Sequence, residues 1–192
     1  MDENSKIAQR VLDFWFGHED SDVFGTNRPE WFLKDPEFDA AIRENFLGDV
    51  EAALAGDLDS LGDDNGQNCL ALLILLDQFP RNLFRDTARA FAGDERARML
   101  VNWAIDLGFD QQTPLFQRFF YYLPLEHSEN LDDQVRCTQL VTAMNDENLL
   151  KYAVAHRDII VRFGRFPHRN KALGRTSTAE ELEFLEGPNS SF

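Results

Sequence analysis

Two proline-containing corners of the sequence carry the residues best suited to bind an anion. The first corner is LDQFPRN at residues 76–82 and the second is FGRFPHRN at residues 163–170, and each follows an apolar stretch with helical spacing. Arginine offers a rigid two-point fork that matches carboxylate and phosphate groups. We therefore predict that the corners line one hollow, which binds an anionic small molecule or a peptide carboxylate. The predicted ligand-binding residues are Arg81, Asn82, Arg85, Arg118, Arg165, His168 and Arg169.

The charge distribution favours an anion site in the C-terminal third of the chain. The formal net charge is −15. Residues 1–64 hold 17 acids and 5 bases, whereas residues 156–175 hold 1 acid and 6 bases. Arginines crowded into this short segment repel one another unless carboxylates or a bound anion neutralise them. The acidic body repels phosphate backbones, so nucleic acid is not an expected partner.

Two other interpretations of these residues stay open. In a scaffold, Arg81 would bind the unpaired carbonyl groups at the end of the preceding helix. Asp77 would then hold Arg81 or Arg85 in an ion pair. In an enzyme that acts on a phosphorylated or carboxylated metabolite, a histidine would serve as acid or base. The candidate catalytic residues are His127, His156, Asp158 and His168.

Known catalytic and metal-binding patterns do not narrow this choice. His156 shares a helical stripe with Tyr152 and Ile160, so it is expected to face inward, as core histidines do. Asp158 and Arg162 have the i, i+4 spacing of a helix ion pair. The sequence has no HExxH pair and no CxxC pair, and we expect neither a metal nor a cofactor.

Apolar residues recur at helical spacing almost throughout, and no stretch alternates with a period of two. Asp35 and Pro36 are typical of a helix start, and that helix is expected to end at Gly56. Pro80 is expected to end the apolar central helix, which begins at residue 67. Pro124 is expected to interrupt a helix that begins at residue 114. The sequence thus predicts an all-α protein of about seven or eight helices.

The chain is long enough to form a single domain over residues 1–192, with residues 187–192 frayed. Its longest uninterrupted apolar run is residues 69–76, which is too short to span a bilayer. The N-terminus lacks the pattern of a secretion signal, and two cysteines do not form a disulfide framework. We therefore expect a cytoplasmic protein without a membrane partner, and the oligomeric state stays open.

Several long motifs resemble a known bacterial family. They are LALLILLDQFPRNLFRDTARAFAGD at 70–94, RFFYYLPLEHSENLDDQ at 118–134 and HRDIIVRFGRFPHRNKALGRTSTAEELEFL at 156–185. Together with VLDFWFG near the start and WFLKDPEFDAAI before the second helix, they resemble the family of domain of unknown function 924. The resemblance implies a tetratricopeptide-like helical array, and it implies no particular activity.

Overall fold

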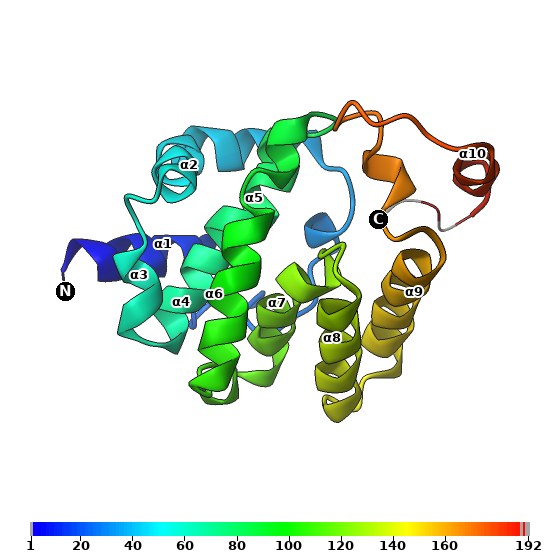
Figure 1. Ribbon diagram of the computed structural model, residues 1–192. Coiled ribbons are helices and arrows are strands. Elements are labelled where there is room, and N and C mark those ends of the chain that lie inside the picture. Colours follow the sequence, from blue (N-terminus) through cyan, green and yellow to red (C-terminus); the bar gives the residue numbers. More distant parts are fainter. Residues whose placement is uncertain (1, 189, 191–192) are drawn as a thin grey trace. The chain divides into compact units, whose positions relative to one another are not determined.

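The computed structural model describes residues 2–188 and 190, and all regular secondary structure in this part of the chain is helical (Figure 1). The predicted all-α class is confirmed. Contacts group the chain into two compact units. Unit 1 comprises the residues up to 85 together with 89–124, and unit 2 comprises 86–88 and the residues from 125 onward. A single domain over residues 1–192 stays a prediction.

Unit 1 is built from helices of very different lengths. Its α-helices are α1 (Glu3–Phe16), α2 (Pro36–Ala55), α3 (Ser60–Asp64), α4 (Gly66–Leu73), α5 (Phe79–Leu83), α6 (Asp94–Asp106) and most of α7 (Leu115–Glu126). The short helical segments are η1 (Pro29–Trp31), η2 (Ile74–Gln78), η3 (Ala88–Phe91), whose first residue belongs to unit 2, and η4 (Asp110–Gln112). The prediction of seven or eight helices did not separate short helices such as α3 and α5 from their neighbours.

The boundaries of α2 follow from local signals in the sequence. The Asp35 side chain accepts hydrogen bonds from the backbone N–H groups of Glu37 and Phe38, and Pro36 occupies the first helical position. Gly56 ends the helix in the left-handed region, with φ of 98°, which glycine adopts without steric cost. The predicted start and end of this helix are confirmed.

The expectation that Pro80 ends the central helix is wrong. After α4 the chain continues through the π-helical segment η2 into α5, and Pro80 lies inside that helix. The Phe79 N–H bonds to the Ile74 carbonyl, five residues back, so the helix gains one residue in this turn. Pro80 lies at the start of the renewed α-helix, where its missing N–H group costs little.

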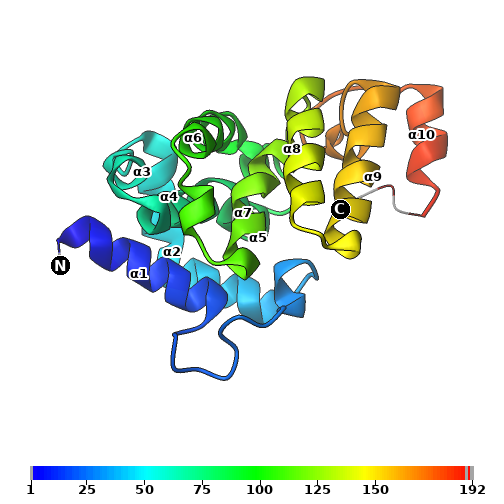
Figure 2. The same cartoon turned by 90° about the horizontal axis from the view of Figure 1, so that it is seen from below.

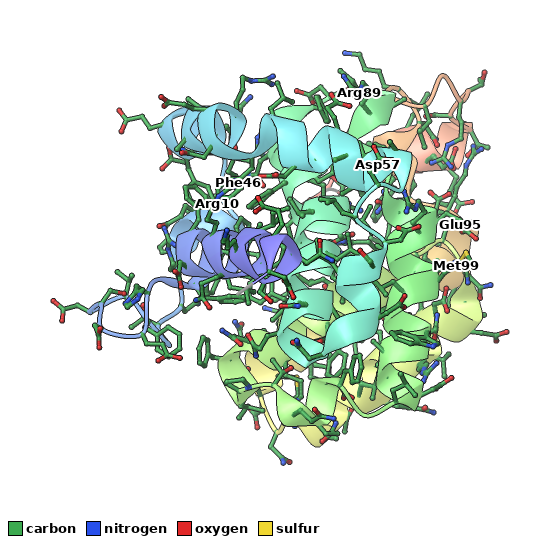
Figure 3. All side chains as sticks on the ribbon, turned by 90° about the vertical axis from the view of Figure 1, so that its left-hand side faces the viewer. Arg10, Phe46, Asp57, Arg89, Glu95 and Met99 are labelled. Carbon is green, nitrogen blue, oxygen red and sulfur yellow. The ribbon has the colours of Figure 1, made fainter. Side chains whose placement is uncertain are left out.

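Aromatic packing forms much of the core of unit 1, as the 17 phenylalanines of the chain suggest. The fully buried ring of Trp15 contacts Phe79 and Phe120 edge-on, with centroid distances of 5.6 and 5.8 Å. At the surface, the Arg10 guanidinium lies over the ring of Phe46 at 5.5 Å (Figure 3). Such pairs are more favourable than their buried area alone implies.

Unit 2 contains the end of α7, the pair α8 (Leu131–Ala143) and α9 (Glu147–Phe163), the turn η5 (Pro167–Arg169) and α10 (Ala179–Leu185). Helices α8 and α9 lie side by side (Figures 1 and 2). The expected interruption at Pro124 is wrong, because α7 runs on to Glu126. Pro124 falls in the last turn, where it removes only one backbone hydrogen bond.

The last helix, α10, begins with a capping box. Thr178 accepts a hydrogen bond from the Glu181 N–H, and the Glu181 side chain accepts one from the Thr178 N–H. Each residue thereby satisfies a backbone donor of the first turn. The predicted fraying of 187–192 falls partly on residues 189, 191 and 192, which lie outside the described residues.

Candidate functional site

The first corner is neutralised by carboxylates of its own unit. Arg81 donates hydrogen bonds to both oxygens of Asp94, at 2.8 and 3.0 Å. Its Nη1 also lies 3.0 Å from Asp77 Oδ1 and 2.7 Å from the Asp77 carbonyl oxygen. The Asp77 side chain is buried, and Arg81 is only 19% exposed. Arg81 thus takes the position that the scaffold interpretation predicts, at the end of the preceding helix.

Arg85 and Asn82 share a different carboxylate, that of Asp39 on α2. Arg85 binds it at two points, 2.6 and 2.8 Å, and Asn82 Nδ2 donates to Asp39 Oδ1 at 2.8 Å. Burial opposes ionisation of Asp39, but these donors hold its pKa below the usual value. Arg81 and Arg85 therefore join the corner to two different elements, α6 and α2.

Arg118 binds backbone rather than a charged partner. Its Nε donates to the carbonyl of Asp110 at 3.0 Å, and its Nη2 approaches the carbonyls of Gln111 and Thr113 at 3.4 and 3.3 Å. These carbonyls belong to η4 and the turn that follows it. Arg118 thus ties α7 to the preceding turn.

In unit 2, the second corner is fixed first by Glu181 of α10. Arg165 binds both Glu181 oxygens, at 2.6 and 2.8 Å, and Asn170 approaches one of them at 3.3 Å. The hydrogen bonds from Arg165 and from the Thr178 N–H lower the pKa of Glu181 to about 2. One carboxylate therefore caps α10 and attaches it to the corner.

A second carboxylate, Glu129, holds the other side of this corner. It accepts hydrogen bonds from the Phe166 N–H at 2.8 Å and from both terminal nitrogens of Arg175, at 2.8 and 3.0 Å. Burial opposes ionisation of Glu129, but these donors keep its pKa below the usual value. Neither Glu129 nor Arg175 is among the residues predicted from the sequence.

Arg169 and His168 flank the buried ring of Phe166. Arg169 is 6% exposed, stacks on this ring at 4.6 Å, and donates to the carbonyl of His127 at 2.9 Å. The His168 ring lies 5.6 Å from the Phe166 ring. Both residues therefore take part in the packing of the corner.

His156 faces inward as predicted and is 4% exposed. Its Nδ1 donates to the Tyr152 carbonyl at 2.9 Å and lies 3.3 Å from Glu126 Oε1. Burial, followed by the nearby His127, lowers the pKa of His156 to about 3. A neutral, buried imidazole is a better core residue than proton carrier at neutral pH.

The contacts around α8 and α9 define the start of one helix and correct one expected ion pair. Asn130 caps α8 by accepting a hydrogen bond from the Asp132 N–H. Arg162 pairs with Glu180 of α10 at 2.9 Å, and Asp158 pairs with the adjacent Arg157 at 2.7 Å. The expected helix pair between Asp158 and Arg162 therefore does not form.

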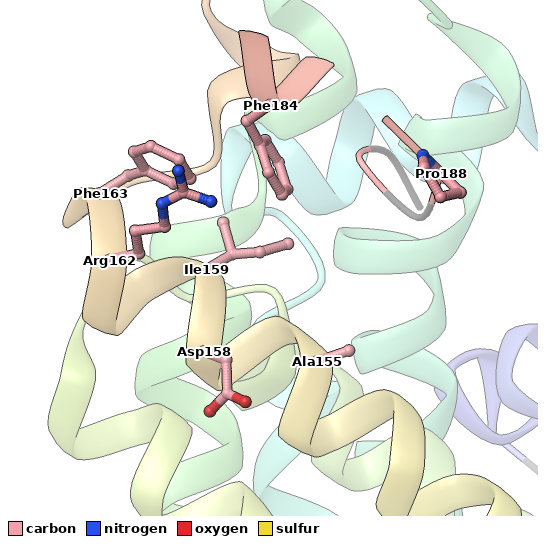
Figure 4. Close-up of a pocket in the computed structure, with 7 residues that line it drawn as sticks. All are labelled: Ala155, Asp158, Ile159, Arg162, Phe163, Phe184 and Pro188. Atoms are coloured by element: carbon pink, nitrogen blue, oxygen red, sulfur yellow. The ribbon is translucent and has the colours of Figure 1, made fainter. Parts of the chain in front are cut away.

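A hollow lies beside α9 in unit 2 and has a volume of about 260 Å³ (Figure 4). Helix α9 contributes residues at i, i+3, i+4 and i+7, which share one face. The remaining lining comes from the end of α9, from α10 and from the segment after it. The lining residues are Ala155, Asp158, Ile159, Arg162, Phe163, Phe184 and Pro188.

Arg162 is the cation of this hollow. Its guanidinium lies 4.6 Å from the Phe163 ring centroid and 5.8 Å from that of Phe184. Its Nε donates to Glu180 at 2.9 Å, while its terminal nitrogens make no hydrogen bond to any described residue. The Arg162 and Glu180 side chains are 51% and 59% exposed. The Arg162 side chain is thus held in place by two rings, and its two terminal nitrogens can still donate hydrogen bonds.

The predicted ligand-binding residues fall into both units. Arg81, Asn82, Arg85 and Arg118 belong to unit 1, whereas Arg165, His168 and Arg169 belong to unit 2. A hollow shared by the two sets stays a prediction. The lining of the described hollow includes one candidate catalytic residue, Asp158, and none of the predicted ligand-binding residues. Sequence reasoning missed Arg162 as a site residue, although its spacing from Asp158 and Ile159 placed it on one helix face with them.

The described residues contain no group of three His, Cys, Asp or Glu side chains that could hold a metal ion. Within the same part of the chain, no helix combines the length and apolar character needed to cross a bilayer.

The fold is that of an all-α protein, with a small surface hollow beside α9 and α10. The chain belongs to the family described as bacterial protein of unknown function (DUF924), whose sequence profile matches residues 11–189. It is also similar to a solved structure of a protein of unknown function from Agrobacterium tumefaciens. The two chains are 39% identical, with a TM-score of 0.86, and the match covers 96% of this chain and 100% of that one. No curated protein matches it.

Proposed function

We propose that this protein is a binding module that takes an anionic ligand in the hollow beside α9. The observation that carries the proposal is Arg162, whose two terminal nitrogens stay available at the edge of an apolar hollow. The two phenylalanine rings restrict the guanidinium, so little side-chain freedom is lost when a ligand binds. The exposed pair with Glu180 is of a kind that contributes about 0–1 kcal/mol, so it competes weakly with a ligand.

The binding site in this proposal differs from the one predicted from the sequence. Arg81, Arg85 and Arg165 each bind a carboxylate at two points, and an external anion would have to displace that carboxylate. Breaking a partly buried pair leaves an uncompensated charge and is strongly unfavourable. Arg162 has one exposed partner and needs no such displacement.

The experiment is a titration followed by the methyl signals of isoleucine. The chain has six isoleucines, and Ile159 lines the hollow, so its signal can be assigned with an Ile159→Val variant. Carboxylates with apolar groups, sugar phosphates and inorganic phosphate are added in turn. We expect at least one anion class to shift the Ile159 signal saturably. If no class shifts the signal at concentrations up to about 10 mM, the proposal is wrong. A dissociation constant above that concentration corresponds to a binding free energy weaker than about 2.7 kcal/mol.

A second candidate function, that of a scaffold without a ligand site, is favoured by the internal pairing of the other arginines. Arg81, Arg85 and Arg165 join neighbouring elements within a unit through buried or half-buried carboxylates. The same titration separates the two functions, because a scaffold predicts no saturable shift with any anion.

A further inference from the structure

We infer that the ligand of this hollow is the C-terminal residue of a peptide, with its carboxylate on Arg162 and an apolar side chain against Ile159 and Phe184. This inference rests on the binding function proposed above and specifies its ligand class. It is drawn from the charge, the size and the surroundings of the hollow.

The charge of the lining favours a monoanion. Among the described lining residues, Arg162 is the only cation and Asp158 the only acid, so this part of the lining is formally neutral. Glu180, which binds the Arg162 Nε, adds a further negative charge at the rim. A phosphate dianion would meet two carboxylates and one guanidinium, which is unfavourable. A carboxylate carries one charge on two oxygens, and these match the two terminal nitrogens of one guanidinium.

The size and polarity of the hollow favour an apolar side chain. A volume of about 260 Å³ lies just below the range of roughly 300–1,000 Å³ that is usual for small-molecule sites. Ala155, Ile159 and Phe184 supply an apolar wall, and Ile159 is only 6% exposed. The hollow is therefore large enough for one apolar side chain and its carboxylate, and too small for a nucleotide or a cofactor.

The surface next to the hollow favours a peptide over a free carboxylic acid. Tyr152 lies one turn before Ala155 on the same side of α9 and is 47% exposed. A small acid confined to the hollow would leave this ring uncovered. The residues that precede a bound C-terminal residue can extend along α9 and cover it, which adds apolar contact.

The test compares matched probes by the same isoleucine methyl titration. The main probe is an N-acetylated tetrapeptide that ends in leucine with a free carboxylate. The others are the same peptide as its C-terminal amide, N-acetyl-leucine and inorganic phosphate. We expect the peptide acid to bind at least tenfold more tightly than the amide, because a charged two-point hydrogen bond is lost. We expect it also to bind more tightly than N-acetyl-leucine.

Two variants show whether Arg162 is the group that binds. Arg162→Gln should weaken binding of the peptide acid at least tenfold and leave binding of the amide unchanged. Arg89→Gln is the matched control, because Arg89 also stacks on a phenylalanine, Phe84, at 4.0 Å and pairs with an exposed carboxylate. Arg89 belongs to unit 1 and is not one of the residues that line the hollow, so its replacement should change neither affinity.

The possible failures are distinguishable. If phosphate or N-acetyl-leucine binds at the hollow at least as tightly as the peptide acid, the peptide inference is overturned while the binding function stands. If the acid and the amide bind equally, Arg162 does not recognise a carboxylate and the inference is again overturned. If no probe shifts the Ile159 signal, the binding function fails as well.

Discussion

Replacing Gly93 by alanine should destabilise unit 1 strongly, because no space exists for a methyl group at that position. A Cβ atom on Gly93 would lie 2.1 Å from the carbonyl oxygen of Leu76 and 2.9 Å from its carbonyl carbon. Leu76 belongs to the π-helical segment η2 and is 1% exposed. The obstacle is therefore buried backbone, which cannot move aside as a flexible side chain can.

The magnitude follows from the movement that the new methyl group requires. The contact has to lengthen from 2.1 Å to at least 3.0 Å, so the start of α6 and η2 must separate by about 0.9 Å. Overpacking of a dense core costs about 1–3 kcal/mol. Asp94, the next residue, would also move relative to Arg81 and weaken a charged hydrogen bond worth about 1.5–3 kcal/mol. We expect a total loss of about 3 kcal/mol, and a melting temperature lower by about 10 °C.

The assay can follow unit 1 separately, because its fluorescence is distinctive. The tryptophans of the chain all belong to unit 1, and they are Trp15, Trp31 and Trp103. Thermal unfolding followed by tryptophan fluorescence should therefore report the loss, with urea unfolding as a second measure of the free energy.

Gly48→Ala is the matched control for this substitution. Gly48 lies in the interior of α2, and a Cβ there would have no neighbour within 4 Å. Alanine is the better helix former, so this variant should be more stable by about 0.5–1 kcal/mol. Equal stability of Gly93→Ala and the parent protein would refute the close approach of α6 to η2.

Three further predictions concern carboxylates and a histidine. Asp39→Asn should lower the free energy of unfolding by about 2 kcal/mol in urea, because Arg85 loses a two-point charged partner. Asp49→Asn in the same helix weakens a one-point pair with Arg10, whose side chain is 53% exposed, and should cost less than about 1 kcal/mol. The pKa of His156 falls from 6.5 to about 3 on folding, so the unfolded state binds the proton at higher pH than the folded state does. The free energy of unfolding should therefore drop by up to about 1.4 kcal/mol per pH unit as the pH falls from 6.5 towards 3. In urea unfolding at several pH values, His156→Gln should remove that part of the slope. The pKa of Glu181 falls to about 2 on folding, so the ionised carboxylate stabilises the folded state above about pH 4.5, and this stabilisation is lost as the pH falls towards 2. Unfolding followed by circular dichroism should show a smaller loss of stability across that pH range in Glu181→Gln than in the parent protein.

Local signals in the sequence predicted the helix boundaries that depend on neighbouring residues. The Asp35 side chain bonds to backbone groups two and three residues away, and Gly56 ends the helix through its own backbone conformation. The continuation of the helix past Pro80 could not be predicted in this way. It depends on the bond from the Phe79 N–H to the Ile74 carbonyl, a π-type register that the packing of a buried segment decides.

The arginines were recognised from the sequence, but their partners were not. Arg85 binds a carboxylate 46 residues away, and Arg165 binds one 16 residues away, on the next helix. Composition shows that an acidic chain offers many possible partners to each arginine, and only the fold selects one. The same reason explains why Arg162 was missed, since its availability depends on how Phe163, Phe184 and Glu180 surround it.

The scaffold and binding interpretations are physically connected through Glu181. Phe184 lines the hollow from α10, and the charged pair of Glu181 with Arg165 attaches α10 to the second corner. An arginine that only holds the fold together can thus determine whether the hollow exists. Loss of peptide binding in Glu181→Gln, together with an unchanged tryptophan melting curve, would locate this dependence in unit 2. Unchanged binding in that variant would show instead that other contacts are sufficient to hold α10 against α9.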